Sequence, residues 1–133
     1  MNHDQYARLV AALHEHAAGV TAATAAVGLI ATHRVWLTRP DFHPLIQRGR
    51  CHGTGQPTAL IRWRAAVTAL NQHRLPCSSS EADILRMAAS LGAGTPIRLR
   101  AVLGCLDHRN IALVTKAIAL ANDTWPINRE DRT

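Results

Sequence analysis

The stretch TPIRLRAVLGCLDHRNIALV, Thr95–Val114, indicates the fold class because it combines a short helix, a turn and a second helix. Gly104 suits the turn, since glycine tolerates the positive φ that a helix-turn-helix turn admits. Asp107 is a favoured N-cap residue, and apolar residues follow it at helical spacing. The pattern predicts helices over 97–104 and 107–121 in a helix-turn-helix-like arrangement.

The residues before this stretch predict another helix, over about 81–91. Ser78 with Glu81, or Ser80 with Asp83, fits the capping-box pattern that marks a helix start. An apolar face follows the cap at three- and four-residue spacing. The segment therefore supplies the support helix that a helix-turn-helix requires.

Toward the N-terminus, apolar periodicity predicts the remaining helices. Their expected ranges are 4–18, Thr21–Leu37, a short helix after Asp41, and Thr58–His73. The second of these is poor in charge, which predicts a central position in the fold. The segment 47–58 contains three glycines and one proline without periodicity, and we expect a loop there.

These patterns predict an all-α protein, a compact orthogonal bundle of six or seven helices with no strand. The alanine-rich, aromatic-poor composition also favours helix over sheet. We expect one domain over 1–123, with a subdomain break near 75–80 as an alternative. Residues 124–133 are expected to form a polar tail, with Trp125 as a candidate to dock back on the domain.

The charge of the chain is positive and unevenly distributed. The net charge is +6, and Lys116 is the only basic residue that is not arginine or histidine. Between His16 and Ser80 there is one acid, Asp41, against seven arginines. A local excess of one sign favours contact with an anionic partner, and the arginine guanidinium grips phosphate oxygens in pairs.

The sequence predicts a nucleic-acid-binding surface made of arginines. Arg109 is placed to reach a base edge, whereas the two arginines before Gly104 suit phosphate contacts. Trp63 lies between two arginines, and it is either a core residue of an apolar seam or a stacking platform for single strands. The predicted nucleic-acid-binding residues are Arg34, Arg48, Arg50, Arg62, Arg64, Arg98, Arg100 and Arg109.

Two segments of the sequence fit a helix-turn-helix, and plain helical packing is the alternative for each. The helix after Asp107 is apolar on several sides, so it fits a scaffold better than a reader of DNA bases. A second candidate spans Thr21–Phe42, where Gly28 and Trp36 are poorly spaced for such a motif. A continuous core helix is the preferred interpretation of that second segment.

No catalytic residue, metal site or cofactor is predicted, and we do not expect an enzyme. The histidines and cysteines lack paired zinc-ligand spacing, and acids are scarce and dispersed. CHGTG, Cys51–Gly55, lacks the lysine ending of a phosphate loop. The odd number of cysteines favours reduced thiols. With no leader-like N-terminus and no run of about 20 apolar residues, the expected setting is the cytoplasm, without membrane contact.

Two of the segments resemble a group of small, uncharacterised actinobacterial helical proteins, as does the stretch WLTRPDF. The first is RLPCSSSEADILRMAASL, Arg74–Leu91, and the second is TPIRLRAVLGCLDHRNIALVTKAI, Thr95–Ile118. The group shares an LPCSxxE...LxxAAS segment, followed by a proline, a short helix and a GLDxxN-like turn. The resemblance implies a helical fold and a bacterial cytosolic setting, and it implies no activity.

The chain departs from that pattern at three positions. Cys105 interrupts the Gly-Leu-Asp turn, and Arg98 and Arg100 stand where neutral or acidic residues are expected. These departures argue against a family-wide binding site at the two arginines.

The leading functional hypothesis is binding of DNA or RNA through the arginine-rich middle of the chain. The alternative is a protein-interaction domain or homodimer that binds no nucleic acid.

Overall fold

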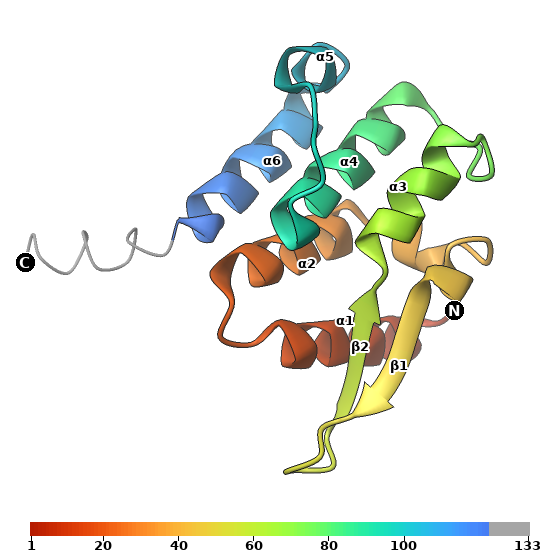
Figure 1. Cartoon of the computed structure of the whole chain (residues 1–133), viewed down its shortest axis with the longest axis vertical. Helices are drawn as coiled ribbons and strands as arrows, with labels where there is room; N and C mark the ends of the chain where they lie inside the picture. Colours follow the sequence, from red (N-terminus) through yellow and green to blue (C-terminus); the bar gives the residue numbers. More distant parts are fainter. Residues whose placement is uncertain (123–133) are drawn as a thin grey trace, which may run out of the picture.

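The computed structural model describes residues 1–122, whereas 123–133, with the whole of the predicted tail and Trp125, lie outside the described residues. The described part is mostly helical, as predicted, with one small two-stranded sheet (Figure 1). The elements in chain order are α1 (His3–Ala17), α2 (Thr21–His33), η1 (Trp36–Thr38), η2 (His43–Leu45), β1 (Ile46–Arg50), β2 (Pro57–Ile61), α3 (Trp63–Asn71), α4 (Ser79–Ala93), α5 (Leu99–Leu103) and α6 (His108–Ala121).

Helix α2 lies at the centre of the described fold and packs against α1, α4 and α6. Its residues before His33 are alanine, threonine, glycine or aliphatic, so it can be covered on several sides without burying a charge. The prediction of a central position for this helix is confirmed. One cluster of buried residues joins side chains from both sides of the 75–80 break.

The turn after α2 seats two aromatic side chains in the core. Trp36 and Phe42 are both fully buried, with ring centroids 5.6 Å apart. The indole Nε1 of Trp36 donates a hydrogen bond to the backbone carbonyl of Glu81 at 3.0 Å. This bond satisfies the indole N–H, which burial would otherwise leave without a partner, and it ties η1 to the first turn of α4.

The helix starts follow their local capping signals. The Ser78 hydroxyl accepts from the Glu81 N–H at 3.2 Å, and the Glu81 carboxylate accepts from the Ser78 N–H at 2.8 Å. Asp107 caps α6 by accepting from the Asn110 N–H at 2.8 Å. The predicted capping box at Ser78 and the predicted cap at Asp107 are both confirmed.

β1 and β2 form an antiparallel hairpin. Two predictions were therefore wrong: the sequence predicted no strand, and it predicted a loop over 47–58. Across the tip, the Cys51 N–H donates to the Gln56 carbonyl at 2.8 Å. Gly55 adopts φ +72°, which glycine reaches without a Cβ clash. The strands form because β2 packs against α1, a contact that connects distant parts of the chain.

Several predicted helix boundaries were also wrong. α2 ends at His33 rather than Leu37, because Arg34 leaves the helix with φ +66°. The next long helix begins at Trp63 rather than Thr58, since residues 57–61 belong to β2. The helix expected after Asp41 is a single 3₁₀ turn, η2, with a proline inside it.

The segment of Thr95–Val114 forms two helices, but its turn differs from the predicted geometry. α5 has only five residues, and Gly104 has φ −67°, in the right-handed region. The prediction that Gly104 supplies a positive φ is therefore wrong. The helix-turn-helix interpretation of these two helices stays a prediction.

Candidate functional site

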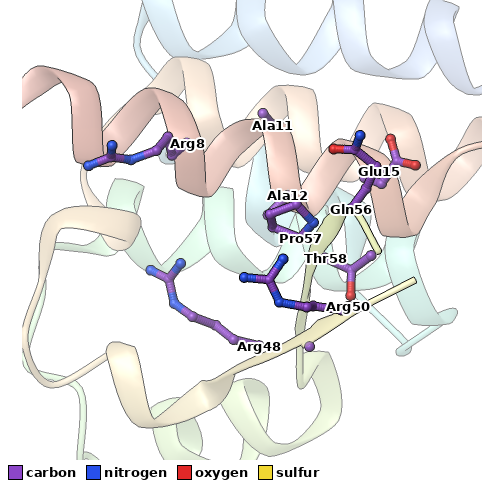
Figure 2. Close-up of a pocket in the computed structure, with 10 residues that line it drawn as sticks. Arg8, Ala11, Ala12, Glu15, Arg48, Arg50, Gln56, Pro57 and Thr58 are labelled. Atoms are coloured by element: carbon purple, nitrogen blue, oxygen red, sulfur yellow. The ribbon is translucent and has the colours of Figure 1, made fainter. Parts of the chain in front are cut away.

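A large open groove of about 670 Å³ lies between α1 and the β1–β2 hairpin (Figure 2). One wall comes from α1 and the other from β1 and the start of β2. The groove is lined by Arg8, Ala11, Ala12, Glu15, Arg48, Gly49, Arg50, Gln56, Pro57 and Thr58. It combines a size suited to ligand binding with a lining that joins an apolar floor to three arginines.

The α1 wall is a single stripe of that helix. Arg8, Ala11, Ala12 and Glu15 fall at i, i+3, i+4 and i+7, which places them on one face. The neighbouring stripe, which includes Leu9 and Leu13, is buried in the core. Because the middle of this stripe is alanine, with Ala11 exposed and Ala12 buried, no long side chain of α1 fills the space between α1 and the hairpin.

The β1 wall presents two arginines on the same face of the sheet. Arg48 pairs with Ala59, and Arg50 pairs with Pro57, in the antiparallel register. Ala59 is buried on the side that packs toward α1. Directly paired residues project to the same face of a sheet, so both arginines emerge on the α1 side. Figure 2 shows their side chains directed from β1 toward α1.

The groove carries an excess of positive charge without internal neutralisation. The side chains of Arg8 and Arg48 form no ion pair or hydrogen bond with any described residue. Arg50 donates from Nη1 to the Gly55 carbonyl at 2.9 Å, which orients its guanidinium but does not balance its charge. Glu15 is the only carboxylate in the lining, at the end of the groove away from Arg8 (Figure 2).

The arrangement is suited to binding an anion with several acidic groups. Each guanidinium offers five N–H donors in a planar fork and stays charged at physiological pH. Within residues 1–122 the one ion pair joins Arg39 and Asp41, outside the groove lining. The donors of the groove arginines are therefore available to phosphate or carboxylate oxygens.

The hairpin tip adjoins the groove and is polar. His52 and Thr54 are exposed at the tip. Hydrogen bonding by the Thr54 hydroxyl lowers the pKa of the Cys51 thiol, and the backbone N–H groups of Thr54 and Gly53 add smaller effects in the same direction. No carboxylate occurs anywhere from residue 46 to residue 61. The tip thus extends the acid-free part of the surface beyond the groove itself.

The predicted site residues do not form one surface. Arg48 and Arg50 line the groove, whereas the other six predicted arginines do not. Arg34 stacks over the ring of Tyr6, with 4.4 Å from its guanidinium carbon to the ring centroid. Arg64 donates to the carbonyl of Ala93 at 3.4 Å, at the far end of α4. Of the remaining four, Arg62 precedes α3, Arg98 precedes α5, Arg100 lies in α5 and Arg109 lies in α6.

Arg8 is the groove residue that the sequence interpretation missed. Its signal was available, because Arg8 and Glu15 share a face of α1 with two alanines. That pattern marks a polar stripe beside a core stripe, but it does not say what the stripe faces. Only the packing of α1 against β2 brings Arg8 to the same groove as Arg48 and Arg50.

Of the two roles predicted for Trp63, a core residue or a stacking platform for single strands, its packing fits the core residue. It is half-buried and packs against the core cluster, with its indole ring beside Gly92. A Cβ at Gly92 would meet the indole nitrogen at 2.3 Å, so the ring occupies the space that a larger residue would need. One side of Trp63 is therefore covered by α4.

The described residues contain no group of three or more histidine, cysteine, aspartate or glutamate side chains positioned to hold a metal ion. Cys51, Cys77 and Cys105 are free thiols. No helix within residues 1–122 has both the length and the apolar character needed to cross a bilayer.

Among known proteins, no family model, no curated sequence and no solved structure matches this chain.

Proposed function

We propose that this chain is a non-enzymatic, cytoplasmic nucleic-acid-binding protein whose basic groove between α1 and β1 holds the phosphate backbone. The observation that carries the proposal is the convergence of Arg8, Arg48 and Arg50 on one open groove. None of the three has a carboxylate partner among the described residues. Arginines from two elements that lie on one surface form the electrostatic footprint of a polyanion site.

The acid-free hairpin supports the same proposal. Residues 46–61 contain two arginines, one histidine and no carboxylate, so the strand that forms the groove does not repel phosphate at any position. The contacts available are to phosphate oxygens rather than to base edges, because the arginines lie inside the groove. Binding is accordingly expected to depend strongly on salt and weakly on sequence.

The test compares two double-arginine variants by fluorescence anisotropy with a short labelled DNA duplex. R48A/R50A removes two groove arginines, whereas R98A/R100A removes the same charge from the α5 region, which does not line the groove. Three phosphate contacts predict a slope of log affinity against log salt of about −2.7 on duplex DNA. The wild type should then lose affinity about 40-fold between ~50 and ~200 mM salt.

The two variants should differ in slope as well as in affinity. R48A/R50A should retain one contact, with a slope of about −0.9 and a loss of only about 3.5-fold over the same salt range. R98A/R100A should keep the wild-type slope. Equal effects of the two variants would show that net charge alone binds the DNA. No binding of DNA or RNA by the wild type at ~50 mM salt would refute the proposal.

A second candidate function is self-association, and exposed aliphatic residues favour it. Leu99 on α5 and Ile118 and Leu120 on α6 are each about half exposed, at 51%, 50% and 51%. Ile118 and Leu120 both lie in the last turns of α6, and exposed aliphatic groups that form a patch are typical of protein-interaction surfaces. Light scattering should then give a mass of twice 14.5 kDa, and a monomeric mass at high protein concentration would reject a homodimer.

The helix-turn-helix-like pair of α5 and α6 is a secondary element of this proposal. Arg98, Arg100 and Arg109 are exposed there, but they are not among the three phosphate contacts assigned to the groove. They lie outside the groove lining. The R98A/R100A control therefore also measures how much this pair of helices contributes.

A further inference from the structure

We infer that the nucleic acid held by this groove is a duplex, and that the tip of the β1–β2 hairpin enters its major groove. The inference rests on the proposed function and narrows it to one class of ligand. Single strands and duplexes share the phosphate chemistry that the arginines recognise. They differ in what else the protein must offer: stacking faces for exposed bases, or an element that fits a helical groove.

The described residues offer no free aromatic face for base stacking. Tyr6, Trp36 and Phe42 are buried, with 6%, 0% and 0% of their surface exposed. Trp63 is half-buried, and its indole ring lies against α4 at Gly92. Proteins that hold single strands without sequence preference rely on stacked aromatic side chains, which contribute about 1–3 kcal/mol per base. Among residues 1–122, the groove arginines therefore have no aromatic stacking platform of the kind that such single-strand-binding proteins use.

The hairpin has the shape that a duplex groove accepts. It is a two-stranded antiparallel ribbon, and its tip extends past α1, away from the helices (Figure 1). The major groove of B-DNA is about 12 Å wide and admits a two-stranded β-ribbon, whereas the minor groove is only about 6 Å wide. A ribbon of two strands about 4.8 Å apart, together with its side chains, fits the major groove but not the minor groove.

The position of the arginines on the ribbon agrees with a tip that enters the major groove while one phosphate backbone of the duplex lies against α1 and β1. Arg48 and Arg50 lie on the α1 side of β1, so one phosphate backbone can run along the groove between β1 and Arg8 (Figure 2). The tip beyond Arg50 carries exposed polar side chains, among them His52 and Gln56. These can approach base edges without burying an apolar or acidic group.

The outer edge of β1 gives the ribbon access to the duplex. The described sheet has two strands, and β2 is the one that packs against α1. The other edge of β1 has no neighbouring strand within residues 1–122. The positive, glycine-containing strand at this edge, with Gly49 between its two arginines, is poorly suited to pairing with a second copy of itself, because like charges would face each other. It is suited to a polyanion.

The experiment measures binding of the full chain to a labelled DNA duplex and to one of its strands alone, at ~50 mM salt. The wild type should bind the duplex at least about tenfold more tightly than the single strand. H52E places a carboxylate at the tip, and Q72E places one at the exposed end of α3, far from the hairpin (Figure 1). H52E should weaken duplex binding at least about fivefold, and Q72E less than about twofold.

Each outcome separates this inference from the proposed function. Equal or tighter binding of the single strand, or wild-type duplex binding by H52E, would overturn the inference while nucleic-acid binding itself stands. Absence of binding to either form would instead refute the proposed function. Both variants lie at exposed positions, and their circular dichroism spectra should match the wild type, which keeps misfolding from imitating a loss of binding.

Discussion

Replacing Gly92 with alanine is expected to destabilise the protein, although alanine is the better helix former. Gly92 lies in α4, and a Cβ there would come within 2.3, 2.7 and 2.8 Å of three atoms of the Trp63 indole ring. These atoms belong to a rigid ring rather than to the end of a flexible chain. The ring or the helix must shift, and such overpacking typically costs about 1–3 kcal/mol.

A matched substitution at Gly28 separates this clash from helix propensity. Gly28 lies inside α2, and a Cβ there would meet nothing within 4 Å. G28A should therefore stabilise the protein by up to about 1 kcal/mol, the propensity difference between alanine and glycine. G92A should make the same propensity gain of about 1 kcal/mol, but the clash with Trp63 should cost about 2 kcal/mol. The net effect of G92A is therefore a loss of about 1 kcal/mol in the free energy of unfolding.

Urea denaturation followed by circular dichroism measures both variants. In thermal melts, 1 kcal/mol corresponds to about 3–4 °C for a chain of 133 residues, so the two melting temperatures should differ by about 7 °C. In a W63L background the ring is absent, and G92A should no longer destabilise. The reasoning is refuted if G92A is as stable as the wild type, or if the cycle between Trp63 and Gly92 gives no coupling energy.

Three further predictions concern charge, capping and pH. E15Q should tighten DNA binding about two- to fivefold at low salt, because it removes the only carboxylate lining the groove; weaker binding would contradict the proposed position of the backbone. S78A should cost about 1 kcal/mol of stability by removing a cap of α4, and equal loss in the control S80A would show that the cap is not the cause. Burial, followed by the charge of Arg109, lowers the pKa of His33 below its usual 6.5. The native state therefore binds fewer protons than the unfolded state, and stability should fall as pH drops below 6.5, by up to about 1.4 kcal/mol per pH unit. Urea denaturation at several pH values should show a flatter dependence for H33Q, and identical slopes would contradict this assignment.

Local signals in the sequence predicted the parts of the fold that depend on neighbouring residues. The capping box at Ser78 and the cap at Asp107 need only a side chain and a backbone N–H three residues away. The central position of α2 followed from its lack of charge. Such features can be predicted because their physical cause lies within one turn of the helix that they start or within the helix itself.

The hairpin could not be predicted in this way, because its strands have little strand character of their own. β1 is IQRGR, an exposed polar strand, and its turn lacks the two-residue Asn-Gly or Asp-Gly signal. Its strand conformation depends on pairing with β2, and β2 depends on packing against α1. Long-range contacts of this kind override weak local propensity. The early end of α2 at Arg34 has a similar origin, since local periodicity continued to Leu37.

For the candidate site, the order of residues is enough to show an arginine-rich middle, no acid from 46 to 61, and a polar stripe on the first helix. Which of these charges act together depends on how the elements pack. That packing brings Arg8 against Arg48 and Arg50 across an alanine-lined groove, and it leaves the other six predicted arginines outside that groove. The physical reason is that charge is a property of each residue, whereas a binding site requires guanidinium groups from elements about 40 residues apart in the chain to face the same space. That convergence follows from the packing of β2 on α1.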